Sequence, residues 1–394
     1  MKKKFACLAM AMVMVLSLAA CGGKKEEAPA AAPAESGSDS SVSVFKVGTI
    51  GPLSGDAAIY CQAVANGAKI AVDEINAAGG AIQFELQSQD DEADGEKSVN
   101  AYNTLMDWGM QVMVGPTTTG ASIAVSAQAN ADRTFMLTPS ASSVDVIDGK
   151  DNVFQVCFTD PNQGVASADY ISANMAGAKV AVIYRNDDAY SQGIRDTFVS
   201  EAADKGLEVV YEGTFTADTA TDFSVQLTGA QSAGADTVFL PIYYQPASVI
   251  LNQANAMGYE PTFFGVDGMD GILTMEGFDT SLAEGVMLLT PFSADAEDAR
   301  TQTFVKAYQD QFGETPNQFA ADAYDAVYIY AAALEAAGCT ADMSSADICE
   351  ALVGVMSTIS VDGLTGQGMT WDASGAVSKA PMAVIIENGT YVLP

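Results

Sequence analysis

Residues 45–88 read FKVGTIGPLSGDAAIYCQAVANGAKIAVDEINAAGGAIQFELQS, a stretch that contains one complete strand–helix–strand unit. Residues 45–50 form a short apolar run that predicts a strand, and residues 59–78 carry apolar side chains at helical spacing up to a glycine pair. Residues 81–88 then alternate as a second strand. This order of elements is typical of a parallel sheet covered by helices.

The same alternation is predicted along most of the chain, with a restart at residues 179–184 after a break near Phe158. Further strands are expected at 111–114, 134–137, 208–211, 237–240 and 262–264, and further helices at 96–108, between the two strands that follow, and at 192–205, 222–233 and 247–257. The last part is expected to form helices 296–312, 317–337 and 346–356 and a β-like tail at 368–371, 382–387 and 391–393. We therefore predict an α/β protein with two Rossmann-like lobes, each a parallel sheet flanked by helices.

Composition and charge exclude several classes of function. The 394 residues are 49% hydrophobic, which is enough for the cores of two domains. Fifty acidic residues against 17 basic ones give a net charge of −33, so nucleic acid is not an expected partner. The chain has no histidine, which excludes histidine-based nucleophilic catalysis and most zinc sites. No phosphate-binding loop, dinucleotide-binding turn or EF-hand spacing occurs, and we expect no enzyme activity, no cofactor and no metal.

The N-terminus has the pattern of a secreted lipoprotein. A basic start precedes an apolar run over residues 5–20, which is shorter than the ~20 residues that span a bilayer. Leu18-Ala19-Ala20-Cys21 resembles the bacterial lipobox, so residues 1–20 are predicted to be a signal peptide and Cys21 the lipidated first residue. Residues 21–43 would then be the lipidated cysteine and a flexible tether that hold the protein at the outer face of the cell membrane. The alternatives are an uncleaved anchor and ordinary cleavage beside a chance cysteine.

Four further cysteines, Cys61, Cys157, Cys339 and Cys349, lie in the globular part. Outside the cytoplasm disulfides can form, and Cys339 with Cys349 is the favoured pair because the two are close in sequence. Cys61 and Cys157 could pair only if the fold brings them together. Alternatively, all four are free and buried as small hydrophobic side chains.

Two hydroxyl-rich segments follow predicted strands. Residues 114–122 (VGPTTTGAS) leave one strand and enter a helix, and residues 137–143 (LTPSASS) follow the next strand. Hydroxyls and free N–H groups at a helix N-terminus bind carboxylates, and ligands of open α/β sheets lie beyond the carboxyl ends of the strands. The alternative is that Thr119 and Ser142 only cap their helices.

The strand ends of the second predicted lobe carry acidic and aromatic residues instead. They include Asp187 to Tyr190, the pair Tyr243-Tyr244, and Gly265 to Gly268 around Asp267. A carboxylate flanked by tyrosines suits an ammonium group and an apolar chain. The two lobes together are therefore complementary to a zwitterion.

In combination these motifs resemble the leucine/isoleucine/valine-binding family of ABC-importer receptors, over about residues 44–394. The segments that carry the resemblance are 51–55 with Tyr60, 71–80, 89–91, 114–116, 138–142, 160–164, 190–193 and 323–326. The resemblance implies the hinged periplasmic-binding-protein type I fold. It also implies an extracytoplasmic, monomeric receptor that delivers a branched-chain or similar neutral amino acid to the membrane permease subunits of an ABC importer.

Position by position, the resemblance implies the following roles. Thr119 and Ser142, with backbone groups of Ser140, would hold the α-carboxylate, and Asp267 would hold the α-ammonium. The side-chain pocket would be lined by Tyr60, Tyr190, Tyr243 and Phe319.

The chain departs from the family pattern at three positions in or near the implied binding site. Asp267 is shorter than the glutamate associated with branched-chain receptors, Gln155 stands where many relatives carry arginine, and Cys61 replaces a usual glycine.

The resemblance also implies that the chain crosses between the lobes near residues 159, 292 and 381. Lobe 1 would comprise residues 44–159 and 293–381, and lobe 2 residues 160–292 and 382–394.

Two other functions stay open: a bilobed module that senses a ligand without transport, and an importer receptor for an amide or a small carboxylate.

Overall fold

The computed structural model describes residues 42–394. The predicted signal peptide, Cys21 and nearly all of the tether lie outside the described residues. Within residues 42–394, no helix is long and apolar enough to cross a membrane.

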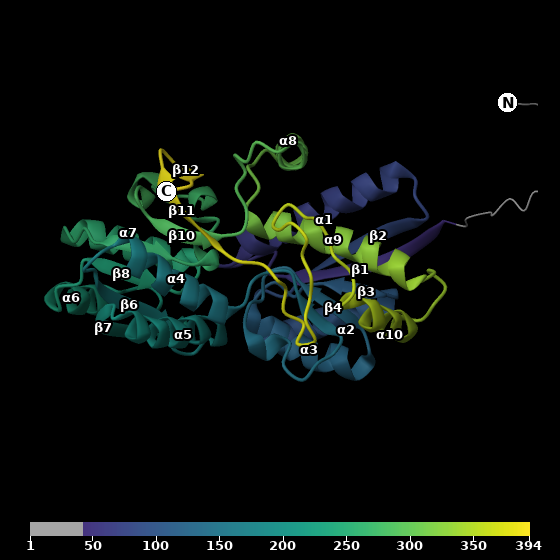
Figure 1. The fold of residues 1–394 in the computed structure, drawn as a ribbon, viewed down its shortest axis with the longest axis horizontal. Coiled ribbons are helices and arrows are strands. Elements are labelled where there is room, and N and C mark those ends of the chain that lie inside the picture. The colour runs from purple at the N-terminus through teal and green to yellow at the C-terminus, as the bar shows by residue number, and fades with distance from the viewer. Residues whose placement is uncertain (1–41) are drawn as a thin grey trace, which may run out of the picture. The chain divides into compact units, whose positions relative to one another are not determined.

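The first sheet has five strands in the order β2-β1-β3-β4-β5, and every neighbouring pair is parallel. Its strands are β1 (Ser43–Gly51), β2 (Ile82–Asp90), β3 (Val112–Val114), β4 (Phe135–Thr138) and β5 (Val153–Gln155). The connecting helices are α1 (Ala58–Ala78), α2 (Gly95–Trp108) and α3 (Thr119–Asp132). Figure 1 shows these helices around the strands, which are buried along β3 and β4.

Three helices from much later in the chain pack onto this first sheet or its helix α1: α8 (Ala299–Phe312) packs against α1, and α9 (Gln318–Ala337) and α10 (Ser345–Met356) pack onto the sheet. Helix α9 lies against α1, and α10 lies against α9 and β4 (Figure 1). The two long helices approach closely at Gly67, where an added Cβ would lie 2.0 Å from the carbonyl oxygen of Ala320. Only glycine permits this contact, which fixes the position of the residues at the start of α9.

The second sheet has seven strands in the order β12-β11-β10-β9-β8-β6-β7. They are β6 (Lys179–Arg185), β7 (Glu208–Phe215), β8 (Thr237–Leu240), β9 (Thr262–Gly265), β10 (Met287–Thr290), β11 (Met382–Glu387) and β12 (Thr390–Val392). Its helices are α4 (Asp160–Asn174), α5 (Ala189–Lys205), α6 (Ser224–Ser232) and α7 (Tyr244–Met257). The predicted fold class is confirmed, but this sheet is mixed because β11 runs antiparallel to β10 and β12 antiparallel to β11.

Two strands and one α-helix have no counterpart among the expected elements, and one segment expected to be β-like is not a continuous strand. β5 and β10 are only three and four residues long, and α4 has a polar sequence with little apolar periodicity. Helix α4 is instead fixed by a cap, because the side chain of Thr159 accepts a hydrogen bond from the N–H of Asn162. The segment 368–371, expected to be β-like, makes two isolated antiparallel β-bridges, from Met369 to Val361 and from Trp371 to Val377, and does not form a continuous strand.

All four cysteines of residues 42–394 are free and buried, so the favoured Cys339–Cys349 disulfide is wrong. Cys339 lies just beyond the end of α9, and its N–H donates to Leu334. Cys349 lies in α10 and is fully buried near Asn152, the residue before β5. Burial raises the pKa of Cys349 to about 12, as expected for a thiol that acts as a core side chain.

Candidate functional site

A small cavity lies at the carboxyl ends of strands from both sheets. It is lined by Tyr60, Thr117, Thr118, Thr119, Ser140, Tyr190, Tyr243, Asp267, Gly268 and Phe319. Seven of the eight predicted ligand-binding residues are therefore brought together, and the exception is Ser142. The first sheet and its helices contribute α1, the turns after β3 and β4, and the start of α9. The second sheet contributes the start of α5 and the turns after β8 and β9.

The turn between β3 and α3 presents two free hydroxyls. Thr118 is the residue that precedes the first turn of α3, yet its side chain makes no capping bond. The Oγ1 atoms of Thr118 and Thr119 are buried and have no hydrogen-bond partner within the described part of the chain. The first N–H groups of a helix also lack intrahelical acceptors. The alternative that Thr119 only caps its helix is therefore not supported, and this turn is suited to bind an anion.

The turn after β4 is held in place by hydrogen bonds that leave Ser142 behind the cavity. The hydroxyl of Ser140 donates to the carbonyl oxygen of Thr117 at 2.5 Å. Gln155 donates to the carbonyl oxygens of Ala141 and Ser143, at 2.8 and 3.1 Å. Gln155, one of the three residues that depart from the family pattern, thus fixes the backbone of this turn. The predicted direct role of Ser142 does not fit, because its buried hydroxyl faces the amide of Gln163 at 3.5 Å.

Asp267 is the acidic group of the cavity and is only 3% exposed. The hydroxyl of Tyr190 donates to its Oδ1 at 2.5 Å, and the N–H of Gly268 donates to the same hydroxyl at 2.9 Å. An added Cβ on Gly268 would lie 2.5 Å from this hydroxyl, so glycine is required here. Burial raises the pKa of Asp267 to about 6, and no lysine or arginine is among the residues that line the cavity. A cationic group of a ligand would be the first positive charge beside Asp267.

Aromatic rings from both sheets form the wall of the cavity. The ring of Tyr60 lies 4.6 Å from that of Phe319 and 5.5 Å from that of Tyr243, and Tyr243 stacks on Tyr190 at 4.9 Å. The hydroxyl of Tyr60 donates to the carbonyl oxygen of Gly268, across the gap between the sheets. The space left between these side chains is about 20 Å³, room for about one water molecule.

Several residues of the site were not assigned a role from the sequence. Thr117, Thr118 and Gly268 lie in segments that were singled out, but side-chain direction could not be read from the pattern. Gln163 accepts a hydrogen bond from the N–H of Asp267 at 3.1 Å. Asp160 is buried with neither carboxylate oxygen paired, and burial holds its pKa well above the usual range. Both of these residues belong to the 160–164 motif, which was their only sequence signal.

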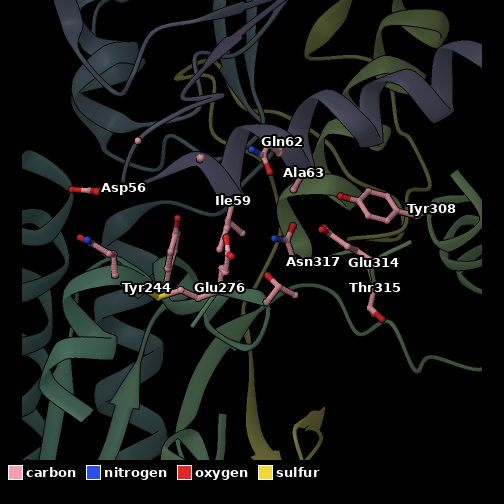
Figure 2. A pocket seen from close by; sticks show the side chains of 15 residues that line it. Asp56, Ile59, Gln62, Ala63, Tyr244, Glu276, Tyr308, Glu314, Thr315 and Asn317 are labelled. Carbon is pink, nitrogen blue, oxygen red and sulfur yellow. The ribbon is translucent and has the colours of Figure 1, made fainter. Parts of the chain in front are cut away.

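A second, larger cavity of about 420 Å³ lies beside the first, and we call it the outer cavity. Figure 2 shows Gln62 and Ala63 of α1 facing Tyr244 and Glu276 across it. Its further lining side chains include the acidic residues Asp56 and Glu314 as well as Ile59, Tyr308, Thr315 and Asn317 (Figure 2). The ring of Tyr244, which lines the outer cavity, lies 5.0 Å from that of Tyr60, which lines the first cavity. Among residues 42–394 no group of three histidine, cysteine or acidic side chains is placed to hold a metal ion.

Comparison with known proteins identifies relatives along nearly the whole described chain. The periplasmic binding protein family model matches residues 44–390. The Leu/Ile/Val-binding protein homolog 3 of Brucella melitensis is 32% identical over 318 residues, which cover 78% of this chain and 82% of that protein.

Solved structures of the same type are also similar. The branched-chain amino acid transporter substrate binding protein LivJ of Streptococcus pneumoniae, in complex with isoleucine, is 31% identical with a TM-score of 0.79 and covers 88% of this chain and 97% of its own. The leucine binding protein LivK of Thermotoga maritima is 26% identical with a TM-score of 0.79 and covers 89% and 97%.

Proposed function

The chain belongs to the periplasmic binding protein family, the substrate-binding proteins of ABC transporters, and we propose that it binds a branched-chain or similar neutral amino acid between two hinged lobes. Members of this family bind solutes for transport and are not enzymes. We take residues 44–159 and 293–381 as lobe 1, and residues 160–292 and 382–394 as lobe 2.

The observation that carries the proposal is the distribution of charge and hydroxyls around one cavity. Asp267 and Tyr190 come from the second sheet, and the unpaired hydroxyls of Thr118 and Thr119 come from the first. We assign Asp267 to the α-ammonium of the ligand, and Thr119 with the first N–H groups of α3 to the α-carboxylate. Ser140 would contribute through its backbone, because its hydroxyl already donates to Thr117.

The aromatic residues would enclose the ligand side chain. Tyr60 and Phe319 come from one lobe and Tyr190 and Tyr243 from the other, and their contacts leave room for only about one water molecule. A leucine side chain is much larger than this space. We therefore propose that the lobes separate to admit the ligand and then close on it, with the bond between Tyr60 and Gly268 among the contacts that must open.

The free energies of the proposed contacts can be compared with that of micromolar binding. Hydrogen bonds to charged groups contribute about 1.5–3 kcal/mol each, and burial of a leucine-sized side chain contributes another ~1.5–3 kcal/mol. Two ionic contacts and one buried side chain give about 4.5–9 kcal/mol, so additional hydrogen bonds to the carboxylate and ammonium groups must offset the cost of closing the lobes for binding to reach the ~8 kcal/mol of micromolar affinity.

Calorimetric titration of the protein with the twenty amino acids tests this assignment. We expect saturable one-to-one binding of at least one branched-chain amino acid, and loss of at least tenfold in affinity for Asp267→Asn. Glu276→Gln is the matched control, because it removes a carboxylate from the outer cavity without touching the site. Equal losses in the two variants would show that only the general negative charge matters.

We further propose that the protein is a monomer anchored to the outer face of the cell membrane through lipidated Cys21, where it hands its ligand to permease subunits of an ABC importer. The lipobox-like residues Leu18 to Cys21 support the anchor. Replacement of Cys21 by serine should move the protein from the membrane fraction to the soluble fraction. Unchanged membrane association in this variant would contradict the anchor but leave ligand binding untouched.

A further inference from the structure

A third cavity, separate from the proposed amino-acid site, lies next to β12. It has a volume of about 470 Å³, and we call it the β12 cavity. It is lined by Val305 and Gln309 of α8 and by Asp270, Gly271, Leu273, Thr274, Phe292, Ala294, Asp295, residues 314–317 and residues 389–391. None of these residues lines the amino-acid cavity, but Thr274, Glu314, Thr315 and Asn317 also line the outer cavity, and the last three are visible in Figure 2.

Asp270 gives this cavity an unsatisfied acceptor. Its side chain is 2% exposed, and its Oδ2 accepts a hydrogen bond from the N–H of Gln318 at 3.0 Å. Its Oδ1 is buried and has no partner in the described part of the chain, and the same holds for the hydroxyl of Tyr391. Burial raises the pKa of Asp270, and the Tyr391 hydroxyl nevertheless lies close enough to the carboxylate to lower that pKa by a smaller amount, as a weak hydrogen-bond donor. A buried acceptor of this kind is stabilised by a donor that enters the cavity.

The remaining lining selects the charge and size of that donor. Asp295 and Glu314 add two more carboxylates, and no lysine or arginine is among the lining residues. A single metal ion does not fit, because among residues 42–394 no three acidic, cysteine or histidine side chains are placed around a common point. The apolar side chains of Phe292, Val305 and Pro316 complete the lining, together with Leu273. This combination suits an organic cation with an apolar body.

We propose that the β12 cavity is a second binding site, which takes a small primary ammonium ion with a short alkyl chain. The ammonium group donates to Asp270 Oδ1 and to the oxygen of Tyr391, and the alkyl chain packs against Phe292 and Val305. This inference does not depend on the proposed amino-acid function, since the two cavities share no residue.

The two sites are nevertheless connected through Gln318. Its backbone N–H donates to Asp270, and its side-chain amide donates to the carbonyl oxygen of Asp267 at 3.2 Å. The N–H of Asp270 also donates to the carbonyl oxygen of Asp267 at 2.9 Å. Gln318 is followed by Phe319, which lines the amino-acid cavity. An ion at Asp270 therefore acts on the same short segment that positions Asp267.

Calorimetric titration of the full chain with n-butylammonium chloride, beside 1-butanol at matched ionic strength, tests the site. We expect saturable one-to-one binding of n-butylammonium, with 1-butanol at least tenfold weaker. Asp270→Asn should weaken n-butylammonium binding at least tenfold, whereas Asp267→Asn, three residues away, should retain it.

Ala294→Trp provides a second test that leaves both aspartates intact. Ala294 lines the β12 cavity, so the larger side chain should fill it and abolish n-butylammonium binding in a protein with an unchanged circular dichroism spectrum. The proposal is overturned if n-butylammonium shows no saturable binding in the millimolar range, if 1-butanol binds equally well, or if folded Asp270→Asn and Ala294→Trp proteins bind like the wild type. Loss of binding in Asp267→Asn alone would place the ion in the amino-acid cavity and also refute it.

Discussion

The hydroxyl of Tyr60, on α1 of the first sheet, donates a hydrogen bond to the carbonyl oxygen of Gly268, just beyond β9 of the second sheet. The same hydroxyl accepts a hydrogen bond from the N–H of Tyr244 at 3.2 Å. Tyr60 therefore makes two polar contacts across the gap between the sheets, one of them to the residue after Asp267, whose carboxylate we assign to the ligand ammonium. This arrangement couples closure of the gap to the geometry of the site.

Tyr60→Phe should weaken closure without removing the aromatic wall. The ring contacts with Phe319 and Tyr243 are kept, but both polar contacts are lost. Because each hydrogen bond contributes about 0.5–1.5 kcal/mol net, the loss of two should lower the affinity roughly 5–150-fold, mainly through faster dissociation. Stopped-flow fluorescence measures this rate. Tyr308→Phe, at the outer cavity, is the control, and equal dissociation rates for Tyr60→Phe and the wild type would exclude a role in closure.

Ligand affinity should fall in mildly acidic solution. Burial raises the pKa of Asp267 to about 6, and only its ionised form pairs with an ammonium group. Binding should therefore be constant above pH 7 and weaken as pH falls through 6, to about tenfold weaker at pH 5. Calorimetry between pH 5 and pH 8 measures the profile.

Asp322 makes a control necessary in this experiment. Burial also raises its pKa to about 6, and its charge acts on Asp267. The Asp267→Asn variant should show a flat profile if Asp267 is the titrating group. A profile that keeps its slope in this variant would assign the pH dependence to another residue such as Asp322.

Asp267→Asn should stabilise the ligand-free protein at neutral pH. The pKa of Asp267 is raised in the folded state from the usual 3.8 to about 6, so its contribution to stability is complete below pH 3.8 and is lost as pH rises through 6. Above pH 6 the buried ion lowers the free energy of unfolding by roughly 3 kcal/mol. This figure is a net value that already includes the stabilising hydrogen bond from Tyr190. Asparagine remains neutral, so we expect a gain of about 1–3 kcal/mol at pH 7 and almost none at pH 4. Urea unfolding at the two pH values measures the difference, and a variant less stable than the wild type at pH 7 would be the opposite result.

Thr119 allows stability and binding to be separated. Its hydroxyl has no partner among residues 42–394, so Thr119→Val should leave the free energy of unfolding unchanged or raise it. Ligand affinity should fall about tenfold because a hydrogen bond to the carboxylate is lost. Thr119→Ser keeps the hydroxyl and should restore most of the affinity. If valine and serine at this position give the same dissociation constant, the hydroxyl does not contact the ligand.

The sequence predicted the elements with strong periodicity and the segments that meet at the cavity. Helix α1 was expected at 59–78 and runs from Ala58 to Ala78, because its apolar spacing and terminal glycines are unambiguous. The turns after β3 and β4 could be placed together because parallel strands of one sheet end at the same edge, and the turn after β9 was set opposite them because its chemistry is complementary. Short strands such as β5 and the polar helix α4 gave too little pattern to be recognised.

Side-chain direction and burial at the site could not be predicted from sequence. Ser142 points away from the cavity because Gln155 holds the carbonyl oxygens on either side of it, a contact between residues 12 to 14 positions apart. The buried oxygens without a partner, both of Asp160 and Oδ1 of Asp270, depend on packing by elements from distant parts of the chain. The absence of a Cys339–Cys349 disulfide likewise reflects how α10 packs on the first sheet rather than the spacing of the two cysteines.

The most direct test of the account compares L-leucine with two analogues that each lack one charge, by calorimetry on the same protein. 4-Methylpentanoate has no ammonium group for Asp267, and leucine methyl ester has no carboxylate for Thr119 and the start of α3. If leucine is a ligand, the account predicts about micromolar binding of leucine and at least tenfold weaker binding of both analogues. If another branched-chain amino acid binds instead, the corresponding analogues of that amino acid are used. Binding of 4-methylpentanoate as tight as that of leucine, or no binding of any amino acid, would contradict it.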